Sequence, residues 1–181
     1  MTSLGGLSTV GVTLNDAVLK RLPSASLEEL SPDDIELLLG NARLLRSAAA
    51  ARQTKTLLRG KRLALLCESD DGADAVLFRG AASELGADVS HIRPRFSELG
   101  RPEELRQTAR ILGRLYDGIE CQGLVPALYD VVGREAGVPV YDGLASPAHA
   151  TARLAALLGP GEPPARQRQL VLQTVLLSTL A

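Results

Sequence analysis

The sequence predicts an α/β protein: a three-layer sandwich in which a four-stranded parallel sheet carries helices on both faces. After residue 61, short apolar runs alternate with helical patterns, and each connection is too long for a hairpin, which favours right-handed parallel crossovers. The composition agrees, because hydrophobic residues make up 45% and aromatic residues only 3%, so the core must be built from Leu, Ala, Val and Ile. A chain of 181 residues fits one domain of ordinary size.

The first helix is expected to begin at Ser31. Residues 1–26 place glycines among Ser and Thr, which indicates an N-terminal extension to a domain that spans 27–181. Ser31 can cap a helix, and Pro32 suits its first turn, with carboxylates next to the positive dipole end. Helical spacing predicts one buried face, formed by Ile35, Leu38, Leu39, Ala42, Leu45 and Ala49.

Strands and helices then alternate. Glycines at 86 and 137 are suited to end helices, and the Gly/Pro-rich stretch 159–164 marks a clear break. His149 lies near the start of the helix before that break. The predicted order is strand 63–67, helix 73–85, strand 88–92, helix 102–116, strand 118–121, helix 125–136, strand 138–141, a helix from about 149 to 159, and an amphipathic helix 165–180.

Charge and cysteine content narrow the classes of partner. The 20 Lys and Arg nearly balance the 21 Asp and Glu, so we expect neither a nucleic-acid partner nor an anionic membrane. Cys67 and Cys121 lie within apolar runs and are expected to be buried, reduced thiols, which fits a cytoplasmic protein. The apolar run 170–180 is too short to span a bilayer, so a soluble protein is expected.

Three motifs in register carry a family resemblance. The segment 58–65 reads LRGKRLAL, Leu99-Gly100-Arg101 precedes TARIL at 108–112, and 138–144 reads VPVYDGL. These resemble LKGKTLAL, LGR followed by DTARVL, and VPVINGL in the carbamoyl-phosphate domain of the aspartate/ornithine carbamoyltransferases, closer to the ornithine branch. The resemblance covers most of 27–158 and implies the fold predicted above.

The last helix extends the resemblance. Residues 167–180 are similar to the family's final helix, which ends NRMHTIKAVLVATL and folds back onto the first domain. In the full-length enzymes an amino-acid-binding domain lies between those two pieces, whereas here only the turn 159–164 does. We therefore expect the 165–181 helix to pack back on a domain that lost its partner. The alternative is an unrelated amphipathic terminal helix.

The turn after the first strand lacks the family's phosphate-binding residues. Carbamoyl phosphate is a dianion, and the resemblance implies a Ser-Thr-Arg-Thr-Arg segment there, which surrounds it with donors at a helix N-terminus. Here the matching residues are Asp71-Gly72-Ala73-Asp74-Ala75, preceded by Ser69. Each lost charge-assisted hydrogen bond costs about 1.5–3 kcal/mol, so losing several removes roughly the binding energy of a micromolar ligand. The two aspartates also suit a helix start without any catalytic role.

Two further candidates stand at other strand ends. Gln122 occupies the place where the resemblance implies an arginine on the carbamoyl oxygen. His149 matches the histidine of the family's His-Pro-Cys-Gln segment, but Ala150-Thr151-Ala152 follow it, so it is either a remnant donor or a local cap. His91 has no visible partner and is interpreted as structural. No catalytic residue, metal site or cofactor is assigned.

Three functions stay open. The first is a non-catalytic member of the fold, acting as a scaffold or regulatory subunit in a homo-oligomer, for which the resemblance implies a trimer. The second is a binding protein or enzyme that uses the same cleft for a different small molecule, such as one whose cation meets Glu68, Asp71 and Asp74, or a divalent metal. The third is a split carbamoyltransferase that another chain completes.

Overall fold

The computed structural model describes residues 31–51, 54–93 and 102–180. The extension 1–26 and the Leu99-Gly100-Arg101 motif lie outside them. The elements are α2 (Pro32–Ala50), β1 (Arg62–Leu66), α3 (Ala73–Glu84), β2 (Asp88–Ile92), α4 (Pro102–Leu115), β3 (Gly118–Cys121), α5 (Pro126–Glu135), β4 (Val140–Asp142), α6 (Ala150–Ala156) and α7 (Pro164–Leu180).

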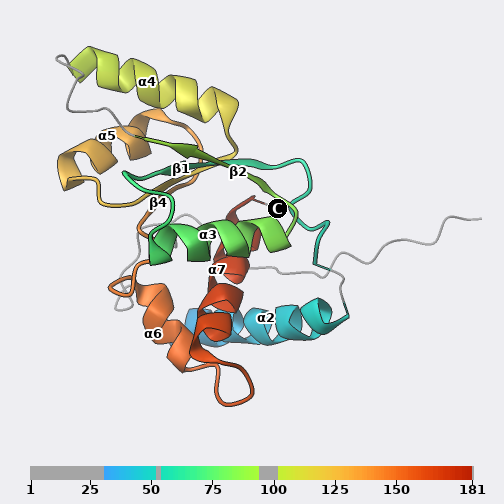
Figure 1. Ribbon diagram of the computed structural model, residues 1–181. Helices are drawn as coiled ribbons and strands as arrows, with labels where there is room; N and C mark the ends of the chain where they lie inside the picture. Colours follow the sequence, from blue (N-terminus) through green and yellow to red (C-terminus); the bar gives the residue numbers. More distant parts are fainter. Residues whose placement is uncertain (1–30, 52–53, 94–101, 181) are drawn as a thin grey trace, which may run out of the picture.

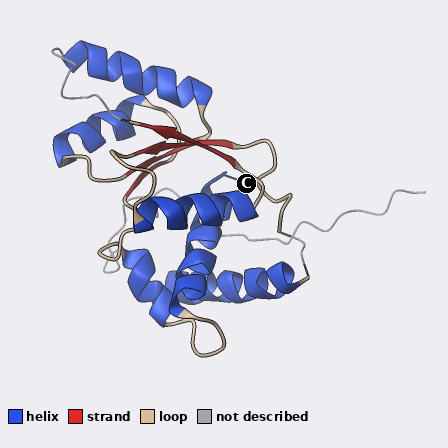
Figure 2. Ribbon diagram, viewed as in Figure 1, coloured by secondary structure: helices blue, strands red, loops and turns tan. Residues whose placement is uncertain are grey.

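The four strands form one parallel sheet in the order β2-β1-β3-β4. Helices α4 and α5 cover one face, while α3 and α7 lie on the other, with α2 and α6 packed beyond them (Figures 1 and 2). The predicted α/β sandwich is therefore confirmed.

Alternation along β1 divides the core into two parts. Leu63 and Leu65 are buried with residues of α2, α3, α6 and α7, whereas Ala64 and Leu66 are buried with residues of α4 and α5. Successive side chains of a strand point to opposite faces, so a strand covered on both faces is mostly apolar. This explains why residues 63–66 of β1 form a continuous apolar run.

Helix α2 begins where the sequence predicts. The Ser31 hydroxyl accepts a hydrogen bond from the Asp34 backbone N–H at 3.2 Å, and the Asp34 carboxylate accepts from the Ser31 backbone N–H at 3.2 Å. This reciprocal capping box satisfies two backbone donors that the helix itself cannot. Leu38, Ala42 and Leu45 on the predicted face are buried.

Helix α7 differs from the prediction, because it is not amphipathic over its central part. Every residue from Leu170 to Leu177 is buried. The helix packs against α2, α3 and α6, and Tyr141 of β4 hydrogen-bonds to Thr179 near its end. Two of its buried polar side chains donate hydrogen bonds within the protein: Gln173 Nε2 to the Ala81 carbonyl oxygen at 3.2 Å, and the Thr174 hydroxyl to the Leu170 carbonyl oxygen at 2.9 Å. The helix packs back on the domain, as expected, but it is enclosed by α2, α3 and α6 rather than lying on the surface.

The limits of two strands also differ from the prediction. The first strand, predicted at 63–67, spans Arg62–Leu66. The fourth, predicted at 138–141, ends at Asp142 and begins at Val140 rather than at Val138. Pro139 stands between these positions and has no backbone N–H for the ladder, although its carbonyl oxygen accepts from the Ile119 N–H at 2.9 Å.

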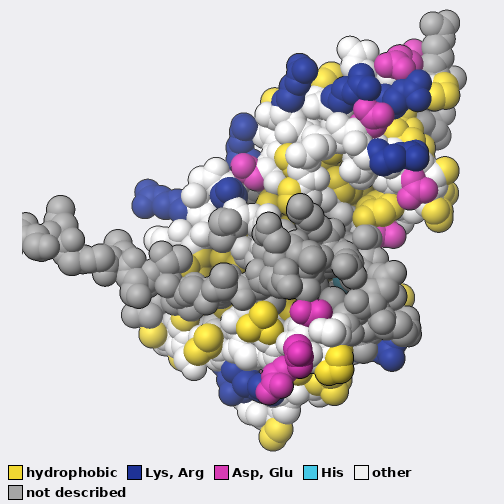
Figure 3. Space-filling model, turned by 180° about the vertical axis from the view of Figure 1, so that it is seen from behind, with side chains coloured by type: hydrophobic (Ala, Val, Ile, Leu, Met, Phe, Trp, Pro, Cys, Tyr) yellow, Lys and Arg dark blue, Asp and Glu magenta, His cyan; other side chains and the backbone are white. Residues whose placement is uncertain are grey.

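The outer surface of α4 carries charges of both signs. Arg106 pairs with Glu103 at 2.7 Å, and Arg110 with Glu135 of α5 at 2.7 Å. Figure 3 shows Lys and Arg side chains interspersed with Asp and Glu side chains over this part of the molecule. In the described part of the chain, no helix is both long enough and apolar enough to cross a membrane.

Candidate functional site

A cavity of about 470 Å³ opens where β3 and β4 end and α3 and α6 begin. We call it the strand-end cavity. Parallel strands bring their carboxyl ends to one edge of the sheet, where helix N-termini also gather, so α/β folds form their sites there. It is lined by Asp74, Gln122, Gly123, Leu124, Asp142, Gly143, Ser146, Ala148, His149 and Ala150.

The structure brings together three of the seven site residues proposed from the sequence. Asp74 lies in the first turn of α3, Gln122 directly follows β3, and His149 is the N-cap residue of α6. All three line the strand-end cavity. The other four, which are Ser69, Asp71, Gly72 and Ala73, are not among its lining residues.

The β1–α3 turn is closed by hydrogen bonds among its own residues. The Ser69 hydroxyl donates to the Asp71 carboxylate, and Gly72 is the N-cap of α3 without a side-chain cap. The Arg79 guanidinium binds the Asp70 carboxylate at 3.0 Å and its carbonyl oxygen at 2.6 Å. This contact holds the pKa of Asp70 below its ordinary value. The cation at this turn is therefore already paired.

The second strand supports the same turn. His91 Nε2 lies 2.8 Å from the Cys67 carbonyl oxygen, and His91 Nδ1 lies 3.9 Å from the Asp70 carboxylate. Arg93 Nε donates to the Glu68 carbonyl oxygen at 3.0 Å. His91 therefore has partners that the sequence did not reveal. Its contacts are structural, as interpreted above.

Glu120 is a buried acid that contacts the cavity residue Gln122 and was not predicted from the sequence. Its side chain is 0% exposed, and burial raises its pKa to about 8. One carboxyl oxygen accepts from Gln122 Nε2 at 3.1 Å and the other from the Leu144 N–H at 3.2 Å. Glu120 thus links Gln122, which follows β3, to Leu144, which follows β4. A carboxylate within the apolar strand GIEC was the available signal.

Asp142 was also missed. It ends β4 and lines the cavity as an exposed residue, and partial desolvation together with the nearby Asp130 raises its pKa. The signal was its position, because a polar residue that ends a parallel strand lies at the same edge as Gln122.

His149 acts as the N-terminal cap of α6. Its Nδ1 accepts from the Thr151 backbone N–H at 3.2 Å, so the ring proton lies on Nε2. Burial lowers its pKa, which favours the neutral ring. Within the described structure, Nε2 is out of contact with solvent and has no hydrogen-bond partner.

The charged groups of the cavity are negative. Asp74 and Asp142 are carboxylates, and the described lining residues include no Lys or Arg. Among the described residues, no three His, Cys, Asp or Glu side chains are grouped so that they could hold a metal ion. Glu68, Asp71 and Asp74 therefore do not form a cluster of metal ligands. Chemically, the cavity offers acceptors, one neutral imidazole and one amide.

Comparisons with known proteins agree with the resemblance. Residues 24–159 match the family model for the carbamoyl-P binding domain of aspartate/ornithine carbamoyltransferase. Over 137 residues the chain is 37% identical to ornithine carbamoyltransferase of Cutibacterium acnes, covering 76% of this chain and 41% of the relative. The catabolic ornithine carbamoyltransferase of Rhizobium meliloti is 35% identical, with 72% and 39% covered. The chain thus spans about two fifths of the curated relatives it matches.

Solved structures show the same part of the fold. Ornithine carbamoyltransferase from Pyrococcus furiosus matches with a TM-score of 0.61 and 26% identity, covering 74% of this chain and 42% of that protein. The anabolic enzyme from Campylobacter jejuni matches with a TM-score of 0.59 and 26% identity over the same shares. The family model ends at residue 159, so the similarity of α7 to the family's last helix stays a prediction.

Proposed function

The chain belongs to the aspartate/ornithine carbamoyltransferase family, and from this premise we propose that it is a non-catalytic member acting as an oligomeric scaffold or regulatory subunit. The observation that carries the proposal is the strand-end cavity, whose charged lining residues are the carboxylates Asp74 and Asp142. A phosphate dianion needs amides and cations around it, and these side chains would repel it.

The helix dipole does not reverse this conclusion. The N-terminus of α3 carries a partial positive charge of about half an elementary charge. Asp74 lies in the first turn of α3 and supplies a full negative charge at the same place. The helix end that could attract a phosphate is therefore already neutralised by the protein's own side chain.

A second deficit concerns the amino-acid substrate. Carbamoyl transfer requires an amine held against the carbonyl carbon, which is a matter of positioning. In this chain α6 and α7 are joined by residues 157–163 alone, so no amino-acid-binding domain is inserted between them. This observation is independent of the cavity's charge and supports the same proposal.

Oligomerisation is part of the proposal. The family resemblance implies a trimer, and light scattering on the purified chain would measure its mass in solution. A trimer or another stable homo-oligomer supports the scaffold role. A strict monomer contradicts it. Recovery from native cells with a chain that supplies the missing domain and cations would instead favour a split enzyme.

The ligand test is a calorimetric titration with carbamoyl phosphate. We expect no binding at micromolar ligand, whereas the ornithine carbamoyltransferase of Cutibacterium acnes serves as the positive control. Gln122→Arg places a guanidinium in the cavity and should improve the affinity of this chain by about tenfold or more. Micromolar binding by the unmodified chain would contradict the proposal.

The formed cavity also supports a second function. A volume of about 470 Å³ is within the range of small-molecule sites, and its acceptor-rich lining suits a ligand other than carbamoyl phosphate. On this alternative the chain is a binding protein or an enzyme for a different small molecule.

A further inference from the structure

We propose that the outward face of α2 binds the same face of a second copy of this chain, with the two helices antiparallel. The inference deepens the proposed scaffold role, on which it rests, because it names one contact of the homo-oligomer. The face carries a groove of about 550 Å³, which we call the α2 groove. The groove is lined by Asp33, Glu36, Leu37, Gly40, Asn41 and Leu44.

Two large apolar side chains of α2 are left in contact with solvent. Leu37 is 39% exposed and Leu44 is 55% exposed, whereas Leu38 and Leu45, one position further along, are buried in the core. Leu37 and Leu44 are seven residues apart, so they lie on the same side of the helix, two turns from each other. Removing this pair from water would favour association with a second apolar surface.

Gly40 lies between these leucines, in the middle of the α2 groove. A Cβ built on Gly40 would meet no neighbouring atom within 4 Å, so the space above it is open. Because glycine has no side chain, another backbone can approach closely at this position. A second helix can therefore pack across α2 at Gly40.

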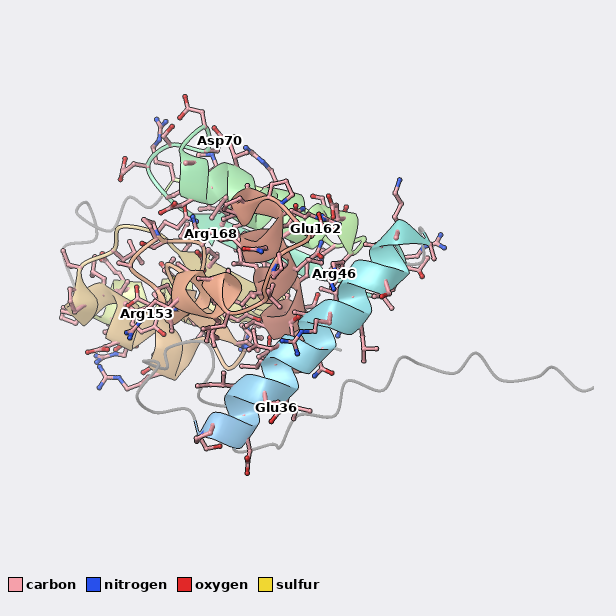
Figure 4. All side chains as sticks on the ribbon, turned by 90° about the horizontal axis from the view of Figure 1, so that it is seen from below. Glu36, Arg46, Asp70, Arg153, Glu162 and Arg168 are labelled. Atoms are coloured by element: carbon pink, nitrogen blue, oxygen red, sulfur yellow. The ribbon has the colours of Figure 1, made fainter. Side chains whose placement is uncertain are left out.

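Two unpaired charges of this face decide the orientation of the partner. Glu36 lies in the N-terminal half of α2 and Arg43 in its C-terminal half, and Figure 4 shows Glu36 and Arg46 toward opposite ends of the helix. Glu36 and Arg43 are seven residues apart, about 10 Å along the axis, which is too far for an ion pair within one helix. Neither forms an ion pair with another described residue.

An antiparallel second copy matches the leucines and the charges at the same time. Helical spacing places Leu37 and Leu44 on one side of Gly40, and it places Glu36 and Arg43 on the other side. A two-fold axis beside Gly40 that reverses the helix direction brings Leu37 of one copy against Leu44 of the other. The same axis brings Glu36 of one copy against Arg43 of the other. Parallel copies would instead set acidic residues beside acidic residues and arginines beside arginines.

The experiment measures the mass of the full chain by analytical ultracentrifugation over a range of concentrations. Glu36→Arg and Arg43→Glu should each weaken self-association by about tenfold or more, because like charges then meet. Mixing the two variants should restore association, since every arginine of one variant then faces a glutamate of the other. Leu44→Asp should also weaken it. The matched control Leu115→Asp, at a leucine of similar exposure on α4 across the sheet, should leave the mass unchanged (Figure 1).

The results separate this inference from the scaffold proposal. A homo-oligomer whose mass is unchanged in these groove variants, or charge variants that fail to associate on mixing, overturns the inference and leaves the scaffold role in place. A wild-type chain that is monomeric at every concentration overturns both. A monomer that Leu44→Asp destabilises in urea unfolding would mean that the chain covers its own groove, which also overturns the inference. Circular dichroism spectra like that of the wild type show that each variant has folded.

Discussion

Replacing Glu120 with glutamine should remove a steep pH dependence from the stability of the fold. Glu120 is fully buried, and its carboxyl accepts from Gln122 and from the Leu144 N–H. Glutamine has nearly the same shape and is neutral at every pH, so it mimics the protonated acid. It retains one carbonyl acceptor and loses the other, at a cost of about 1 kcal/mol that does not change with pH.

The sign of this pH dependence follows from the pKa of Glu120 in the unfolded chain and in the folded chain. Burial raises the pKa of Glu120 from 4.5 to about 8, so between these values the folded chain holds a proton that the unfolded chain releases. The stabilisation is fully present below pH 4.5 and is lost as pH rises through about 8. At about 1.4 kcal/mol per pH unit, the loss is on the order of 5 kcal/mol.

The assay is urea unfolding of both proteins at a series of pH values across this window. The free energy of unfolding of the wild-type chain should fall, relative to Glu120→Gln, by about 1.4 kcal/mol per pH unit. Taking the difference cancels titrating groups that the two proteins share, such as His149. If the free energies of unfolding of the two proteins change with pH in the same way, Glu120 has nearly the same pKa in the folded and unfolded chains. That result would refute the reasoning.

Three further substitutions, one of them a matched control, test the packing. Gly113→Ala should destabilise the fold by about 3 kcal/mol, because the new Cβ would lie 1.7 Å from the Ala136 carbonyl oxygen; Gly133→Ala, which has open space, should be neutral or stabilising by up to about 1 kcal/mol. If Gly113→Ala and Gly133→Ala change the free energy of urea unfolding equally, the close contact at Gly113 is contradicted. Tyr141→Phe removes the hydroxyl bonded to Thr179 and should cost about 1 kcal/mol, and an unchanged thermal midpoint would argue against that bond.

The fold was largely predictable because its signals are local. Strands 88–92 and 118–121 have the predicted limits, because each is a short segment bounded on both sides by helical patterns. The burial of helix α7 was not predictable from its sequence, which includes the polar residues Gln173 and Thr174. Only the tertiary arrangement shows that α2, α3 and α6 enclose this helix. The amphipathic prediction assumed a solvent-facing side that does not exist over residues 170–177.

The candidate site was less predictable than the fold. Asp74, Gln122 and His149 could be named because they follow motifs in register, and all line the cavity. Whether a residue of the β1–α3 turn faces the cavity depends on turn geometry, which sequence spacing does not fix. The role of Glu120 depends on hydrogen bonds to residues that follow two different strands.

The most direct test of the central claim is a crystal structure of this protein grown with millimolar carbamoyl phosphate. The account predicts a strand-end cavity without that dianion, with the β1–α3 turn still closed by Arg79 on Asp70. Ordered carbamoyl phosphate at the N-terminus of α3, with Arg79 released from Asp70 to bind it, would contradict the account.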